Sequence, residues 1–63
     1  MANFEIRFNC KAVQGDYMKV EVCEDDIIIT SFIDGLESDV LFDKSTAIKF
    51  AKTLRTEINK IQD

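Results

Sequence analysis

The sequence contains no histidine, no proline and no tryptophan. Without histidine, the chain lacks the commonest general base and the commonest metal ligand of proteins. It also lacks a nucleophile–histidine–acid triad, a glycine-rich phosphate loop and the ligand spacing of a zinc site. We therefore expect a protein that is not an enzyme and that binds no cofactor and no metal.

Long apolar runs are missing as well. No unbroken run exceeds three residues, as at Ile27–Ile29, whereas a membrane-spanning helix needs about 20. The first residues, Met-Ala-Asn-Phe-Glu, do not form a basic region followed by an apolar stretch, so no signal peptide is expected. These absences predict a cytoplasmic protein without a membrane partner.

The chain is also short, because 63 residues are enough for only one domain, which we place at 1–63. The core of such a domain is thin, and small domains often gain stability from a disulfide, a metal or a second subunit. The apolar content of 46% can stabilise the fold only if nearly every patterned apolar side chain is buried. The sequence therefore raises the question of which of these three supports the fold.

The net charge of −4 makes this a small acidic protein, but the charge is unevenly distributed. Residues 1–43 contain ten acidic and three basic side chains, a balance of −7, whereas residues 44–63 contain five basic and two acidic side chains, a balance of +3. Because phosphate contacts dominate nucleic-acid affinity, the acidic part disfavours nucleic-acid binding. A basic helical face remains compatible with this distribution.

Two segments alternate between apolar and polar residues with a period of two, which is typical of half-buried strands. They cover residues 3–13 and 17–23, with a turn at 14–16 between them. A three-residue turn there would place Phe8 opposite Val22 and would bring the two apolar faces together. A slip by one residue would split the apolar face, so the pattern favours this register.

Two further strands are predicted. A two-residue loop at 25–26 leads into a third strand over 27–33, where apolar residues again dominate. A loop at 34–38 then precedes a short fourth strand over 39–42. Four consecutive strands with short connections predict an antiparallel meander.

The rest of the chain is predicted to be one amphipathic helix. Asp43 is a good N-cap, with Ser45 as a weaker candidate, and no glycine interrupts the run that follows. Its apolar residues fall within about 100° of one another on a helical wheel; they are Ala47, Phe50, Ala51, Leu54, Ile58 and Ile61. The predicted fold class is therefore α+β, a four-stranded antiparallel meander (β-β-β-β-α) with the C-terminal helix packed on one face.

The cysteines and the acidic turn offer little chemistry. In the predicted register Cys10 points into the core and Cys23 to the opposite sheet face, so a disulfide would need a twisted backbone. Free thiols in a reducing cytosol are favoured over that disulfide. Calcium needs six to eight oxygen ligands in a patterned loop, and the consecutive acids at 24–26 do not provide that spacing. A solvated turn is the favoured interpretation.

The sheet face away from the helix carries an unexpected apolar cluster, formed by Ile28, Phe32 and Leu41. One helix can cover only one face, and a contiguous exposed apolar patch usually marks an interface. The alternative is that Tyr17 and long side chains such as Lys19 lie over it. We favour the interface, and with it a homodimer joined through these three residues.

The helix carries basic residues that are candidates for binding phosphate or an acidic partner. They are Lys49, Lys52, Arg55 and Lys60. Because no exposed aromatic residues are interleaved with them, an ordinary solvated face is the favoured interpretation.

The segment GLESDVLFDKSTAIKFAKTL, from Gly35 to Leu54, gives the chain a local likeness to a known family. With its strand order, it resembles one subunit of the single-stranded-DNA-binding transcriptional-coactivator fold. The resemblance implies a dimer and covers about a third of the chain. The basic strand surface and stacking aromatics of that family do not map here, and residues 21–26 are acidic where DNA binding would favour lysine or arginine.

Two functions therefore stay open. The first is a non-enzymatic protein-interaction module, an accessory or inhibitor protein of the kind that phages and mobile elements carry, acting as a homodimer on an unidentified protein partner. The alternative is a single-stranded nucleic-acid-binding protein with a coactivator-like dimeric sheet and helix.

Overall fold

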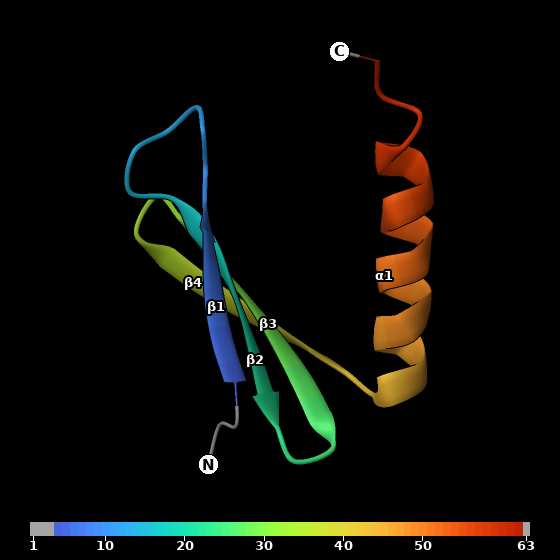
Figure 1. Ribbon diagram of the computed structural model, residues 1–63. Helices are drawn as coiled ribbons and strands as arrows, with labels where there is room; N and C mark the ends of the chain where they lie inside the picture. Colours follow the sequence, from blue (N-terminus) through green and yellow to red (C-terminus); the bar gives the residue numbers. More distant parts are fainter. Residues whose placement is uncertain (1–3, 63) are drawn as a thin grey trace.

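The structure, a computed structural model, describes residues 4–62 (Figure 1). It confirms the α+β prediction, because a four-stranded antiparallel sheet in the order β1-β2-β3-β4 precedes a single C-terminal helix. The elements are β1 (Phe4–Asn9), β2 (Tyr17–Cys23), β3 (Asp26–Ile33), β4 (Leu36–Phe42) and α1 (Lys44–Ile58).

The first hairpin differs from the predicted one in its register. Strand β1 ends at Asn9, and Phe8 lies opposite Met18, not opposite Val22. The connection spans residues 10–16, where the Cys10 amide donates to the Asp16 carbonyl oxygen over 3.0 Å. A shift of four residues keeps the same side chains on the same face, so the alternating pattern could not exclude it. Asn3, the first residue of the predicted strand, lies outside the described residues.

The other two hairpins also differ from prediction: the second has a two-residue loop as predicted but shifted by one residue, and the third has a shorter loop. The second loop is Glu24–Asp25, so that Val22 pairs with Ile27. The third loop is only Asp34–Gly35, and both of its residues have positive φ, 54° and 79°, as a type I′ turn requires. Strand β4 therefore begins at Leu36, and the predicted five-residue loop with its short fourth strand was wrong.

The pairing divides the sheet into two faces. The inner face, on the side of α1, is apolar along most of its length; it carries Phe4, Ile6, Phe8, Met18, Val20, Val22, Ile27, Ile29, Ile33, Leu36, Val40 and Phe42. The outer face carries the alternate residues, most of which are polar or charged. The period of two in the sequence predicted this division correctly, although it did not predict the registers.

Helix α1 begins as predicted, with Asp43 as its N-cap. The Asp43 carboxylate accepts a hydrogen bond from the Thr46 amide over 2.8 Å, and its carbonyl oxygen accepts one from the Ala47 amide over 3.0 Å. The helix ends at Ile58 and is capped by Asn59. Ile61, which was predicted to continue the apolar stripe, therefore lies beyond the last helical residue.

The helix stands away from the sheet over most of its length (Figure 1). Among the described residues, its backbone approaches β3 and β4 but not β1 or β2. The radius of gyration is 13.1 Å, compared with about 10.6 Å expected for a compact domain of 63 residues. Within residues 4–62 no apolar residue is buried, and Thr30, with 3% exposed, is the only buried residue. A single chain therefore does not contain a closed hydrophobic core.

Candidate interaction surface

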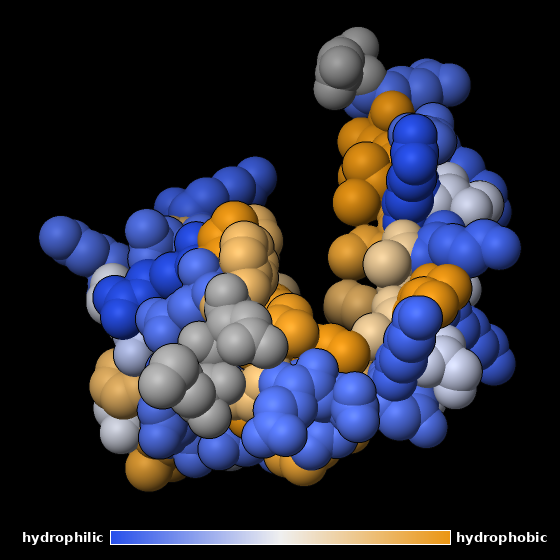
Figure 2. Space-filling model, turned by 60° about the horizontal axis from the view of Figure 1, so that its bottom comes forward, coloured by the Kyte–Doolittle hydropathy of each residue, from blue (hydrophilic) through white to orange (hydrophobic). Residues whose placement is uncertain are grey.

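An open apolar cleft separates α1 from the inner face of the sheet. Figure 2 shows the hydrophobic side chains of the sheet and of the helix facing one another across this gap. Over β1 and β2 the hollow has a volume of about 460 Å³. Its walls come from both elements; they are Ile6, Phe8, Met18 and Val20 from the sheet and Phe50, Ala51, Leu54, Arg55 and Ile58 from the helix.

A second hollow lies on the other flank of the same helical stripe. It has a volume of about 450 Å³, and Phe50 and Leu54 line it as well. Here Phe42, the last residue of β4, makes an edge-to-face contact with Phe50, with ring centroids 5.5 Å apart. This aromatic contact joins the end of β4 to the middle of α1.

The side chains lining the cleft are exposed to an extent unusual for a core. Phe8 is 49% exposed, Phe50 43% and Leu54 46%. Aromatic and aliphatic residues of this kind are normally among the most buried in a folded protein. We call this set of inner-face and helix side chains the open cleft, and it is the largest feature that the sequence analysis missed. The periodicity of the sequence predicts that these helix and sheet residues face one another, but it does not predict whether they are in contact.

The outer face carries an aromatic stack that the strand register predicted from the sequence did not include. Tyr17 and Phe32 stack with ring centroids 5.1 Å apart and planes 13° from parallel. The Arg7 guanidinium lies 4.0 Å from the centre of the Tyr17 ring, a cation–π arrangement. Nearby, the Lys19 ammonium lies 3.5 Å from the Glu21 carboxylate, whose charge raises the pKa of Lys19 above its usual value.

The predicted interface residues lie on this outer face, as expected. Ile28 pairs directly with Leu41 across β3 and β4. Phe32 lies two residues beyond Thr30 on β3, on the same face of the sheet as Ile28. Ile28 and Phe32 are half-buried, while Leu41 is 64% exposed. Because Tyr17 stacks on Phe32, the alternative in which Tyr17 covers part of the patch has structural support.

The outer face is acidic. Its strand residues include five acids and two bases, a balance of −3; the acids are Glu5, Glu21, Asp26, Glu37 and Asp39, and the bases are Arg7 and Lys19. Two such faces pressed together would bring like charges into apposition, which is unfavourable. The open cleft carries much less charge, with Arg55 in one hollow and Lys49 and Glu57 in the other.

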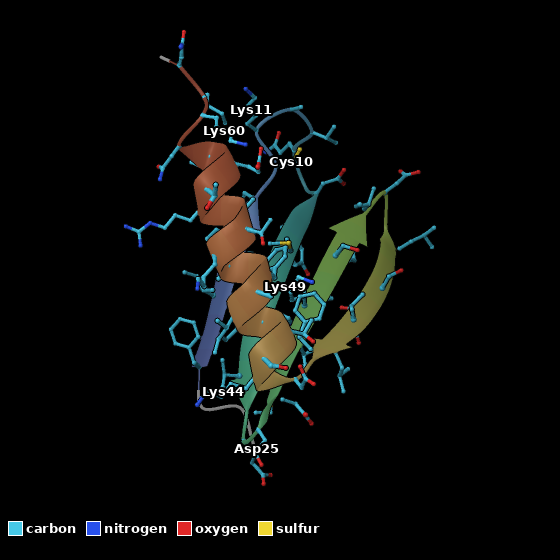
Figure 3. All side chains as sticks on the ribbon, turned by 90° about the vertical axis from the view of Figure 1, so that its right-hand side faces the viewer. Cys10, Lys11, Asp25, Lys44, Lys49 and Lys60 are labelled. Carbon is cyan, nitrogen blue, oxygen red and sulfur yellow. The ribbon has the colours of Figure 1, made fainter. Side chains whose placement is uncertain are left out.

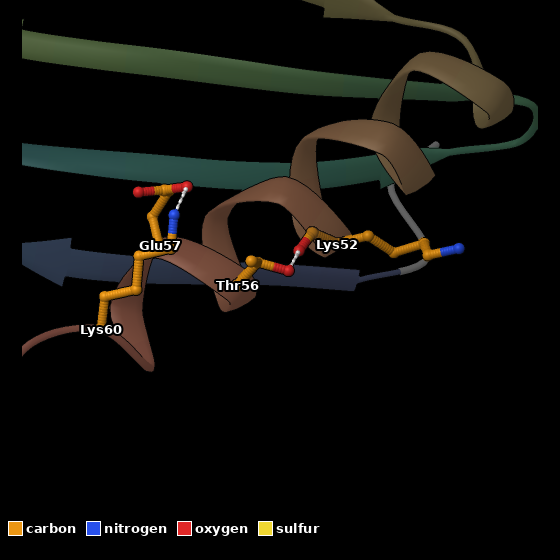
Figure 4. A network of polar contacts seen from close by, with 4 residues as sticks. All are labelled: Lys52, Thr56, Glu57 and Lys60. Atoms are coloured by element: carbon orange, nitrogen blue, oxygen red, sulfur yellow. Dashed lines mark hydrogen bonds and ion pairs between the residues drawn. The ribbon is translucent and has the colours of Figure 1, made fainter.

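The basic residues of the helix do not form one patch. Lys49 lines one hollow of the open cleft and Arg55 lines the other, and Figure 3 shows Lys44 and Lys60 at opposite ends of the helix. Lys60 forms an ion pair with Glu57 over 2.9 Å (Figure 4). The Lys52 carbonyl oxygen accepts a hydrogen bond from the Thr56 hydroxyl over 3.0 Å. The predicted phosphate-binding face is therefore dispersed along and around α1.

The cysteines are both free thiols, one exposed and one half-buried. Cys10 was predicted to point into the core, which is wrong, because it begins the exposed loop after β1. Its Sγ lies 3.4 Å from the amide nitrogens of Ala12 and Val13. Within residues 4–62 there is no group of three or more histidine, cysteine, aspartate or glutamate side chains that could hold a metal ion.

Comparisons with family models, with curated proteins and with solved structures find no match for this chain. Among the described residues, no helix has the length and apolar character needed to cross a membrane. The surfaces described above are therefore the basis for assigning a function.

Proposed function

We propose that this protein is a non-enzymatic interaction module of the cytoplasm that acts as a homodimer, an accessory or inhibitor protein for another protein. One observation supports the proposal above all others. The single chain exposes 5526 Å² of surface, whereas a folded monomer of 7.2 kDa exposes about 4,100 Å². Each chain thus exposes about 1,400 Å² more than a self-contained domain of its mass.

This excess has the size of a protein–protein interface. If two chains bury it together, the interface removes about 2,800 Å² from water, within the range of obligate homodimers. Much of this surface is apolar, since the inner face and the helical stripe supply it, and obligate interfaces resemble a domain core cut in half. Burial at about 25 cal/mol per Å² of apolar area is the main stabilising contribution to such an assembly.

The acidic outer face is the surface that a dimer formed through the open cleft leaves exposed. With its Arg7–Tyr17–Phe32 stack and its balance of −3, it is suited to a protein partner that carries basic side chains. Aromatic residues and arginine are enriched at protein interfaces, which supports this choice. The free thiols are compatible with a reducing compartment such as the cytoplasm.

Sedimentation equilibrium at micromolar concentrations tests the dimer. We expect a mass of twice 7.2 kDa, because a chain without a closed core is unstable alone. A mass that stays near 7.2 kDa over the accessible concentrations would contradict the proposal.

Binding to single-stranded nucleic acid is the second candidate, and the Tyr17–Phe32 stack is the observation that favours it, because bases stack on aromatic side chains. The acids around the stack oppose it, since phosphate would be repelled there. Passage of the protein over a single-stranded-DNA column at low salt separates the two functions. We expect the protein to flow through, while retention that weakens with salt would favour the nucleic-acid function.

A further inference from the structure

We propose that helix α1 of a second copy fills the open cleft, so that each helix packs its apolar stripe on the inner face of the partner's sheet. This inference rests on the proposed homodimer and specifies its interface. Four observations support it: the link between β4 and α1, the matching lengths of helix and sheet, the area left exposed, and the charge of the cleft.

The link between sheet and helix consists of one residue. Strand β4 ends at Phe42 and α1 begins at Lys44, so Asp43 alone joins them. Asp43 is extended, with φ −80° and ψ 175°, and its side chain and carbonyl oxygen are both hydrogen-bonded to the first turn of α1. A link this short, fixed as an N-cap, sets the direction in which the helix leaves the sheet. The helix therefore stands across a gap from its own β1 and β2, and its backbone approaches only β3 and β4.

The helix has the right length for the sheet that it leaves uncovered. Fifteen helical residues span about 22 Å at 1.5 Å per residue. The seven residues of β2 span about 23 Å at 3.3 Å per residue. Each copy thus has one apolar helix face and one apolar sheet face of about equal length, and neither face is covered within its own chain. A two-fold arrangement covers both faces at once, because each helix packs on the sheet of the other copy.

The exposed area argues against smaller occupants. A small molecule in a hollow of about 460 Å³ would fill part of the space between Phe8 and Leu54. It would leave exposed the more distant parts of the inner face, where Phe4 is 54%, Val40 53% and Ile33 58% exposed. A second chain can cover the whole face.

The charge distribution favours a copy of this chain in the cleft over a copy on the outer face. The hollows of the cleft include two basic residues and one acidic residue, Lys49, Arg55 and Glu57. This balance of +1 per chain is spread along α1, and Glu57 already pairs with Lys60 of its own chain over 2.9 Å. Apposition of two outer faces would instead bring a balance of −3 against another of −3, with a greater electrostatic penalty.

Mixed-label NMR tests the geometry directly. A dimer refolded from equal amounts of ¹³C-labelled and unlabelled wild-type protein contains labelled–unlabelled pairs. Isotope-filtered spectra of these pairs report only contacts between chains. We expect cross-peaks between the Leu54 methyl groups of one chain and the Val20 methyl groups of the other. A dimer whose filtered cross-peaks arise from Ile28 or Leu41 would overturn the inference and leave the homodimer standing.

Charge substitutions give an independent readout by sedimentation. Leu54→Glu places a carboxylate in the cleft, so we expect the mass to fall to that of one chain or the variant to be unfolded. Lys52→Glu, on the solvent side of the same helix, and Leu41→Glu, on the outer face, should remain dimeric. Loss of the dimer in Leu41→Glu but not in Leu54→Glu would overturn the inference. A monomeric wild-type protein would instead contradict the proposed homodimer itself.

Discussion

Asp43 has two structural roles. It caps α1, and it is the only residue between the helix and the sheet. Hydrogen bonds from Thr46, together with one from the Ser45 hydroxyl, lower the pKa of Asp43 below its usual value. A carboxylate with a lowered pKa in the folded state stabilises that state above its unfolded pKa of about 3.9, and the contribution is lost as the pH falls through the folded pKa.

The Asp43 cap can be tested by substitution and pH. Asp43→Ala removes the cap, so we expect its thermal midpoint at pH 7 to fall by a few degrees relative to wild type. Asp43→Asn keeps an oxygen acceptor but cannot titrate, so its midpoint should stay close to that of the wild type at pH 7. Below pH 4 the wild type should lose more stability than Asp43→Asn does. Parallel pH profiles for these two proteins would show that the charge of Asp43 contributes nothing.

Asp43 and the Tyr17–Phe32 stack differ in whether they could be predicted from the sequence. Asp43 could be identified as a cap because an acceptor side chain preceded an uninterrupted helical pattern. The stack of Tyr17 on Phe32 could not be identified, because it depends on the register of β2 against β3, which was shifted by two residues from the predicted one.

At the scale of the elements, the tight hairpins determine the registers. The Asp34–Gly35 loop carries a sequence signal for a two-residue turn, because both positions favour positive φ. The prediction of a five-residue loop overlooked this signal and so shortened β4. The loop over residues 10–16 gives no such signal. The Asp16 carboxylate there accepts a hydrogen bond from the Asp34 amide over 3.1 Å, a contact between distant turns that periodicity cannot reveal.

Two substitutions, one in the β3–β4 turn and one in the β2–β3 turn, should change the free energy of unfolding in opposite directions. Gly35 has φ 79° and open space around an added Cβ, so Gly35→Ala should cost about 1–2 kcal/mol through backbone strain alone. Glu24 has φ 54° without being glycine, so Glu24→Gly should stabilise the fold by about 0.5–1 kcal/mol. Urea unfolding at one fixed protein concentration measures both. If both substitutions shift the midpoint in the same direction, the turn geometry described here is wrong.

At the scale of the whole molecule, the chain length alone indicated that a disulfide, a metal or a second subunit would be needed. The alternation of residues showed which side chains face α1. It could not show how far α1 stands from the sheet, because that separation depends on the conformation of Asp43 and on the Phe42–Phe50 contact. The outer-face cluster of Ile28, Phe32 and Leu41 was more conspicuous in the sequence because apolar residues interrupt a polar face there. The larger apolar surface was hidden among residues expected to form an ordinary core.

The open cleft has a consequence for the rate at which the protein folds. Each strand pairs with its neighbour in sequence, so the hairpins of one chain can form quickly through local contacts. In the proposed homodimer, covering the inner face requires an encounter between two chains, which makes the last step second order. In stopped-flow refolding followed by circular dichroism, we expect a fast phase independent of concentration, then a slower phase that accelerates in proportion to protein concentration. A single phase with the same rate at every concentration would mean that each chain reaches its final state alone.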